Sequence, residues 1–162
     1  MIDNDSGHFE VTAEPLSIER EAARVSAPGH GALATFAGTV RDHASGHARV
    51  RGILYESYPE MAEAKMAEIG GELIARHSGG NPMRISIVHR VAELAVGETS
   101  VIIAVGAEHR REALAACAEG IDRVKQVVPI WKKERFEDGS EWVGWGGDPP
   151  DTVPKEDPRR TV

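Results

Sequence analysis

The sequence is short of several residue types, and each shortage excludes a class of protein. Cys117 is the only cysteine among 162 residues, which excludes an internal disulfide framework and a C-x-x-C metal or redox motif. No apolar run reaches the roughly 18 residues that a membrane-spanning helix requires. The 19 Lys and Arg are outnumbered by 26 Asp and Glu, so the broad positive charge of a nucleic-acid-binding protein is missing. We therefore expect neither a nucleic-acid nor a membrane partner.

The amino-terminal segment and the chain length set two further expectations. Residues 1–5 are acidic and polar, unlike a secretory signal, so a cytoplasmic location is expected. A chain of 162 residues is long enough for one domain with its own core. We expect this domain to span residues 1–143, because prolines, glycines and charges dominate residues 144–162 and predict a flexible C-terminal tail.

Hydrophobic spacing predicts an α+β fold with a mainly antiparallel or mixed sheet and two principal helices. The predicted order is β-α-β-β-α-β-β, with hairpins in place of repeated βαβ units. Residues 1–7 are expected to be frayed, and segments 32–40 and 50–57 to pair as a hairpin with a long cationic tip. The predicted strands are His8–Thr12, Ala32–Val40, Val50–Ser57, Arg84–Val91, Ser100–Val105, Ile130–Arg135 and Glu141–Val143.

Three segments have helical spacing. Residues 16–25 predict a short helix capped by Ser17, with Arg20 and Glu21 on its solvent side. Pro59 suits the first turn of a longer helix, and Pro129 ends another. The buried stripes expected on the two longer helices are Ala62, Met66, Ile69 and Leu73 on one, and Leu114, Cys117, Ile121, Val124 and Val128 on the other.

Three groups of basic residues are candidates for binding an anion. One is His109-Arg110-Arg111, at a helix N-terminus, where cations oppose the helix dipole and therefore suggest a functional reason. Another is the pair Lys125 and Lys132, seven residues apart; Lys125 also suits a helix C-terminus, and Trp131 is expected to shield Lys132 from water. The third is the predicted hairpin tip, where solvated surface charge is the simpler explanation for His43, His47, Arg49 and Arg51. The tip residues are Arg41, His43, His47, Arg49 and Arg51.

Other reactive side chains have simpler structural explanations. His43 and His47 have metal-ligand spacing, but Ser45-Gly46 between them disfavours a helix, so no metal site is expected. His89, on an apolar strand face, is interpreted as a core histidine, and Cys117 as inert packing. No nucleophile triad, Walker loop or dinucleotide-binding motif is present, and no cofactor is expected.

Five motifs in order resemble the large, catalytic subunit of molybdopterin synthase. The likeness runs from about Phe9 to Val143, nearly the whole predicted domain. The order and spacing of the motifs, rather than any one of them, make the resemblance specific. The motifs are Phe36-Ala37-Gly38-Thr39-Val40-Arg41, Tyr55-Glu56-Ser57-Tyr58-Pro59, Val88-His89-Arg90-Val91, His109-Arg110, and Lys125 followed by Pro129-Ile130-Trp131-Lys132-Lys133-Glu134.

The resemblance implies an α/β-hammerhead fold and a heterotetramer, in which a homodimer of large subunits carries one small subunit at each end. The small, ubiquitin-like sulfur carrier ends in Gly-Gly with a thiocarboxylate. Two such sulfurs convert cyclic pyranopterin monophosphate into the dithiolene of molybdopterin, a sulfurtransferase step of molybdenum cofactor biosynthesis. A chain with only Cys117 is poorly equipped to carry sulfur itself, which fits an external donor.

The same resemblance implies roles for individual residues. It implies that Lys125 and Lys132 are catalytic, without dividing the chemistry between them, and that His109 and Arg110 act at the dimer interface. Two departures stand out: Ile130 replaces a frequent aromatic residue, and the segment 144–147 lacks a basic residue that some relatives carry. The residues implied to bind substrate are Thr39, Val40, Arg41, His109, Arg110, Lys125, Lys132, Lys133 and Glu134.

Two functions of other classes remain open from the residues alone. A noncatalytic scaffold for a ubiquitin-like tail predicts partner binding that survives loss of Lys132, and no turnover. A phosphate-ester-binding or phosphate-ester-hydrolysing domain that acts alone predicts activity without a small subunit. The missing metal and nucleophile motifs disfavour this last function.

Overall fold

The structure, a computed structural model, describes residues 1–44 and 49–145. Within these ranges the chain forms nine strands and three helices, which confirms the predicted α+β class. The elements are β1 Ile2–Asn4, β2 Gly7–Thr12, α1 Ile18–Val25, β3 Ala32–Thr39, β4 Val50–Ser57, α2 Pro59–His77, β5 Met83–Arg90, β6 Glu93–Ala95, β7 Thr99–Ala107, α3 Arg110–Val127, β8 Ile130–Phe136 and β9 Glu141–Trp145.

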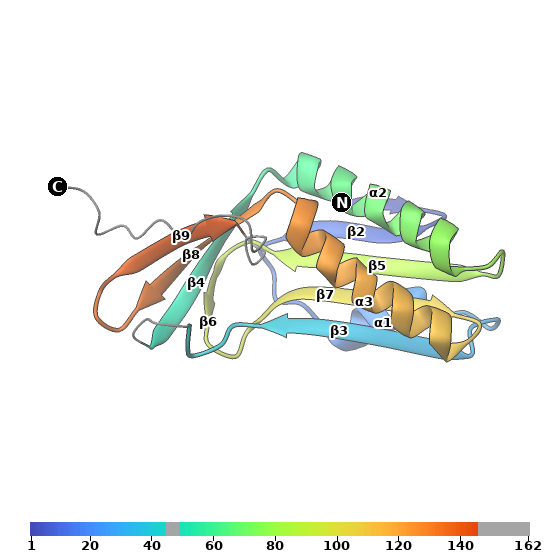
Figure 1. The fold of residues 1–162 in the computed structure, drawn as a ribbon, viewed down its shortest axis with the longest axis horizontal. Helices are drawn as coiled ribbons and strands as arrows, with labels where there is room; N and C mark the ends of the chain where they lie inside the picture. The colour runs from blue at the N-terminus through green and yellow to red at the C-terminus, as the bar shows by residue number, and fades with distance from the viewer. Residues whose placement is uncertain (45–48, 146–162) are drawn as a thin grey trace.

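Five strands form the larger sheet, in the order β1-β2-β5-β7-β3. Only the pair β2 and β5 is parallel; the other neighbours in this sheet are antiparallel. The helices α2 and α3 cover one face of the sheet, and α1 covers the other (Figure 1). Because β5 and β7 lie inside the sheet with helices on both faces, their residues are buried almost throughout, as the apolar run in 100–105 predicts.

The remaining strands form a smaller antiparallel sheet, in the order β6-β4-β8-β9. It projects from the end of the larger sheet at which α3 finishes (Figure 1). Segments 130–135 and 141–143 pair as predicted, with Gly139 in the left-handed region, φ +82°, at the turn. The strand β9 continues to Trp145, two residues into the predicted tail, and residues 146–162 lie outside the described ranges.

Local sequence signals explain where the helices begin and what they bury. Ser17 caps α1 by accepting a hydrogen bond from the backbone N–H of Arg20, and Pro59 occupies the first turn of α2. The predicted stripe of α2 is fully buried, at 0% exposure for all four residues. No helix in the described ranges is long and apolar enough to cross a membrane.

Two predictions about strands are wrong. The segment 1–7 is not frayed, because β1 pairs antiparallel with β2. Segments 32–40 and 50–57 do not form a hairpin: β3 pairs with β7 in the larger sheet, whereas β4 pairs with β6 and β8 in the smaller one. The chain changes sheets between β3 and β4, in a connection of which residues 45–48 lie outside the described ranges.

Two predictions about helix faces are also wrong. Glu21 is 0% exposed, and its carboxylate accepts a hydrogen bond from the Ser86 hydroxyl and pairs with Arg20 and Arg24. Leu114 is 61% exposed. The other four residues of the predicted stripe are buried, and the small residues Ala116 and Gly120 share the buried face of α3 with them.

The buried apolar residues form two clusters. The larger core lies between the five-stranded sheet and the helices α2 and α3. The smaller core lies on the four-stranded sheet and contains Val40, Val50, Ile53, Leu94 and Phe136. Tyr55 packs against both cores. The junction of the two cores is where the chain leaves space for a site.

Candidate functional site

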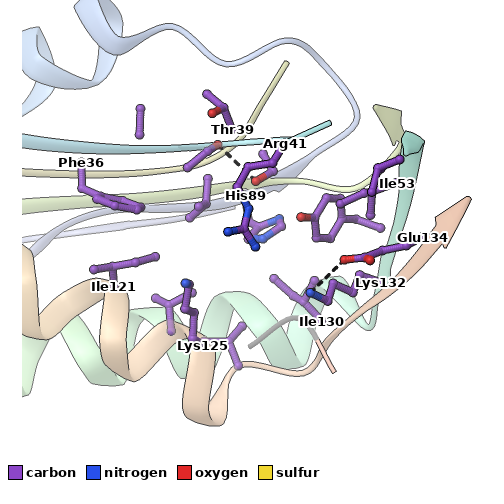
Figure 2. Close-up of a pocket in the computed structure, with 18 of the residues that line it drawn as sticks. Phe36, Thr39, Arg41, Ile53, His89, Ile121, Lys125, Ile130, Lys132 and Glu134 are labelled. Carbon is purple, nitrogen blue, oxygen red and sulfur yellow. Dashed lines mark hydrogen bonds and ion pairs between the residues drawn. The ribbon is translucent and has the colours of Figure 1, made fainter. Parts of the chain in front are cut away.

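A pocket of about 380 Å³ lies where the two sheets and the C-terminal end of α3 meet. Figure 2 shows its lining side chains arriving from β3, β4, β5, α3 and β8. One wall is apolar, with Phe36, Ile121, Val124 and Ile130, and the polar groups gather around it. The pocket therefore combines an apolar wall with charged groups that come from separate segments of the sequence, the usual composition of a small-molecule site.

Three cations from the described part of the chain line this pocket. Arg41 comes from the segment after β3, Lys125 from the last turn of α3, and Lys132 from β8. The turn between α3 and β8 explains how the two lysines face the same space: Val128 caps the helix, and Pro129, which has no N–H to donate, starts the change of direction. The structure thus brings together the two lysines that the sequence singled out.

The three cations differ in what surrounds them. Among the described residues, neither Arg41 nor Lys125 has an ion-pair or hydrogen-bond partner, and both are exposed. Lys132 is half-buried, and its Nζ lies 3.1 Å from Oε1 of Glu134. Arg41 and Lys125 are therefore available to an anionic ligand, while Lys132 and Glu134 form a shielded acid–base pair.

The aromatic neighbour of Lys132 is not the one predicted. Its Nζ lies 5.2 Å from the ring centroid of Trp142, on the adjacent strand β9. Trp131 instead contacts Tyr58 edge to face, with the ring centroids 5.3 Å apart. Successive side chains of a strand point to opposite faces, so Trp131 cannot cover its neighbour Lys132.

The same alternation separates the other residues of this strand. Glu134 lines the pocket beside Lys132. Lys133 does not line it; its Nζ lies 2.6 Å from a carboxylate oxygen of Glu141. Lys133 therefore has a local partner outside the pocket.

Of the three residues at positions 39–41 that were predicted to bind substrate, only two line the pocket. Thr39 and Arg41 line the pocket. Val40 is 3% exposed and belongs to the smaller core, while its backbone N–H donates to Glu98 and its carbonyl accepts from Gly97. Val40 anchors this turn in the smaller core and does not line the pocket, whereas its two neighbours do.

His109 and Arg110 lie at the opposite end of α3 from Lys125. They occupy the N-cap and first position of the helix, and both are exposed. Fifteen residues separate Arg110 from Lys125, which corresponds to roughly 22 Å at the helical rise of 1.5 Å per residue. Within one chain the structure does not bring this pair to the pocket.

Two neutral groups that the sequence analysis did not assign to a site complete the lining. His89 and Tyr55 both border the pocket, with their rings 5.1 Å apart in an edge-to-face contact. Burial lowers the pKa of His89 to about 4, and burial also raises the pKa of Tyr55, against a hydrogen bond with Ser100 that lowers it. The apolar alternation of residues 85–89 correctly indicated a buried ring, but not that a pocket opens beside it.

The described residues contain no group of three or more His, Cys, Asp or Glu able to hold a metal ion. His43 is exposed and lies 2.8 Å from its neighbour Asp42, while His47 lies outside the described ranges. Cys117 is 6% exposed on the buried face of α3, and burial raises the pKa of its thiol to about 11. Cys117 is therefore a packing residue with a buried thiol, as its place in the predicted stripe indicates.

Fold and pocket together define an α+β protein with a cation-lined pocket, suited to an anionic small molecule and equipped with a shielded lysine–glutamate pair. The model of the MoaE protein family matches residues 11–127. The chain belongs to this family, the family of the molybdopterin synthase catalytic subunits.

Individual relatives agree with this assignment. The molybdopterin synthase catalytic subunit of Staphylococcus carnosus is 43% identical over 136 residues, covering 84% of this chain and 88% of the relative. The crystal structure of molybdopterin synthase from Staphylococcus aureus superposes with a TM-score of 0.78 at 37% identity. The superposition covers 84% of this chain and 96% of the other chain. A chain in a complex of subunits 1 and 2 of molybdopterin-converting factor from Helicobacter pylori superposes with a TM-score of 0.63, covering 82% of this chain and 86% of that chain. At 17% identity this likeness shows the fold alone.

Proposed function

We propose that this chain is the catalytic subunit of a molybdopterin synthase. It transfers sulfur from the thiocarboxylated C-terminus of a small ubiquitin-like subunit to cyclic pyranopterin monophosphate, forming the dithiolene of molybdopterin. Membership of the family supports the reaction. The observation that supports this location of the active site is that Lys125, Lys132 and Arg41 all line one pocket.

The exposed cations bind the phosphate of the substrate. Arg41 and Lys125 have no ion-pair partner among the described residues, so an anion that reaches them displaces no existing ion pair. Arg41 presents a planar fork that matches phosphate oxygens, and Lys125 adds a compact charge. The apolar wall beside them accommodates a flat heterocycle.

The shielded pair Lys132 and Glu134 serves the transfer itself. Each sulfur transfer forms a carbon–sulfur bond to the side chain of the pterin, with loss of an oxygen substituent from that carbon. Water then cleaves the bond between the sulfur and the acyl carbon of the carrier, which leaves the carrier as a carboxylate. An ammonium at this point stabilises negative charge on the carbonyl oxygen, and the lysine–glutamate pair exchanges a proton over 3.1 Å. Lys132 is better placed than Lys125 for this role because it is half-buried and already holds a proton-transfer partner.

The donor of the sulfur is a second protein. The only cysteine of the chain, Cys117, is buried and has a raised thiol pKa, so the chain offers no persulfide carrier of its own. The proposed partner is the small sulfur-carrier subunit, whose extended C-terminal Gly-Gly can enter a narrow pocket without side-chain obstruction.

A second copy of the chain completes the site. His109 and Arg110 are exposed, and Arg110 has no ion-pair partner among the described residues, although cations at a helix N-terminus oppose the dipole. A two-fold dimer lets each α3 supply Lys125 to one pocket and its first residues to the other. The proposed assembly is therefore a homodimer within a heterotetramer.

Subunit complementation tests the shared site. In a dimer of one Lys132→Ala chain and one Arg110→Ala chain, one pocket carries both defects and the other carries none. Random mixing of the two inactive variants should therefore restore about one quarter of wild-type activity in a two-fold dimer. Restoration to no more than the residual activity of the separate variants would exclude a site shared in this way.

Product formation tests the activity. Dithiolene formation is measured from cyclic pyranopterin monophosphate and the thiocarboxylated small subunit, with wild type, Lys132→Ala and the control Lys65→Ala, which removes a lysine from α2 that pairs with Glu68. We expect product from wild type and the control, and almost none from Lys132→Ala. No product from wild type, with the small subunit still bound, would favour the scaffold. Turnover without the small subunit would favour a phosphate-ester enzyme.

A further inference from the structure

The pocket contains a hydrogen-bond acceptor that the proposed sulfur transfer does not use. The ring of His89, at the end of β5, is only 6% exposed, yet it lines the pocket. Figure 2 shows it among the lining side chains, with Arg41 on one side of it and Lys125 and Lys132 on the other. A neutral ring in the midst of three cations calls for a chemical reason.

One hydrogen bond of the His89 ring fixes its tautomer. Nδ1 of His89 lies 3.0 Å from the carbonyl oxygen of Arg90, and a carbonyl can only accept, so Nδ1 carries the proton. Burial holds the pKa of the ring near 4, so the ring is neutral at pH 7 and Nε2 keeps a free lone pair. No described residue donates to Nε2, and the ring borders the pocket space.

The orientation of the ring is fixed by its neighbours. The ring of Tyr55 packs against it at an interplanar angle of 66°. Tyr55 is itself hydrogen-bonded to Ser100, whose hydroxyl donates to the carbonyl of Gly38 at 3.2 Å. The acceptor is therefore held in place before any ligand arrives, which reduces the ordering that binding requires.

Among the polar side chains that line the pocket, the hydroxyls of Thr39, Tyr55 and Ser100 can both donate and accept, whereas Nε2 of the neutral His89 ring can only accept. Arg41, Lys125 and Lys132 are donors without acceptor capacity, and Glu134 is engaged by Lys132. A planar heterocycle with N–H groups on its edge and a phosphate at one end matches this distribution. The phosphate is matched by the exposed cations, and the N–H edge by the buried neutral nitrogen.

We propose that His89 Nε2 accepts a hydrogen bond from a ring N–H of the pterin, so that the heterocycle enters first and its phosphate stays at Arg41 and Lys125. This assignment rests on the proposed function and adds an orientation to it. It makes His89 a substrate-binding residue that selects a ring with an N–H donor at that edge. A protonated imidazole, with donors at both nitrogens, cannot make this contact.

The test compares His89→Phe, which keeps a flat ring but removes the acceptor, with His89→Gln, whose amide oxygen accepts. Binding of cyclic pyranopterin monophosphate is measured by calorimetry without the small subunit, and binding of the small subunit is measured separately. We expect His89→Phe to weaken pterin binding about three- to tenfold, the range of one lost hydrogen bond. We expect His89→Gln to retain most of the affinity, and neither change to affect binding of the small subunit.

Each outcome is decisive. Equal pterin affinity in wild type and His89→Phe would refute the acceptor role while leaving the proposed function intact. Equal losses in the Phe and Gln variants would assign the effect to packing and would also refute it. If wild type itself does not bind the pterin, the proposed function fails instead. Should H89F fail to fold, as judged by its thermal unfolding, His89→Leu takes its place in the same comparison.

Discussion

Two adjacent glycines in the middle of α2 should respond in opposite directions to the same substitution. A Cβ atom on Gly70 would lie 2.5 Å from Cε1 of Phe9 and closer still to its Cζ, whereas a Cβ on Gly71 would have no neighbour within 4 Å. Phe9 is 0% exposed and cannot move aside without disturbing the larger core. The two positions share a helix and a backbone conformation, so they differ in packing alone.

The expected magnitudes follow from two opposing contributions. Replacing an interior helical glycine by alanine stabilises a helix by about 1 kcal/mol. At Gly71 this gain stands alone, so Gly71→Ala should raise the free energy of unfolding by about 0.5–1 kcal/mol and the Tm by roughly 2–4 °C. At Gly70 an overpacking cost of about 1–3 kcal/mol opposes the gain, so Gly70→Ala should lower stability, by up to about 2 kcal/mol.

Urea unfolding of both variants measures these changes, with unchanged m-values showing that the unfolding transition itself is the same. Adding Phe9→Leu to Gly70→Ala should remove part of the clash, so the double variant should lose less than the sum of the single losses. If Gly70→Ala proves as stable as Gly71→Ala, then Phe9 does not pack against this turn of α2 and the described core is wrong at that point.

Three further outcomes are expected. Cys117, with a thiol pKa of about 11, should resist iodoacetamide at pH 8 until the protein is denatured; mass spectrometry showing modification of the native protein would contradict its burial. Between pH 6.5 and 4 the unfolded chain binds a proton at His89 that the folded protein excludes. The free energy of unfolding should therefore decrease as the pH is lowered through this range, by up to about 1.4 kcal/mol per pH unit. His89→Gln should make that dependence shallower in chemical denaturation, and an unaltered slope would argue against a neutral ring. Glu134→Gln should lower product formation roughly 100-fold without weakening pterin binding. Glu141→Gln, which removes the partner of Lys133 outside the pocket, should leave product formation unchanged.

Local patterns in the sequence predicted the elements well but not their partners. The Ser17 cap, the Pro59 start and the stripe of α2 all appear in the structure because each depends on residues within one or two turns. The wrong hairpin shows the limit of such patterns. Alternation in 32–40 and 50–57 predicts strands, but it does not reveal that one strand pairs with β7 and the other with β8.

The same limit applies to burial. Glu21 is buried because Ser86, 65 residues away, completes its hydrogen bonds together with two arginines, and no local pattern encodes that partner. In the pocket, Lys125 and Lys132 were identifiable from their spacing around a proline. His89 was predicted to be buried, but its place beside the lysines depends on how the two sheets meet.

The presence of two cores has a consequence for cooperativity. The walls of the pocket belong to two separately packed bodies, and among the described residues Tyr55 packs against both. Segments with their own cores open as partly independent units, so amide hydrogen exchange should be faster in β4, β8 and β9 than in β5 and β7. A ligand that contacts Lys125 on one body and Lys132 on the other stabilises only the state in which both are in place. Substrate should therefore slow exchange mainly in the smaller sheet, and the enzyme should unfold more cooperatively when it is loaded than when it is empty.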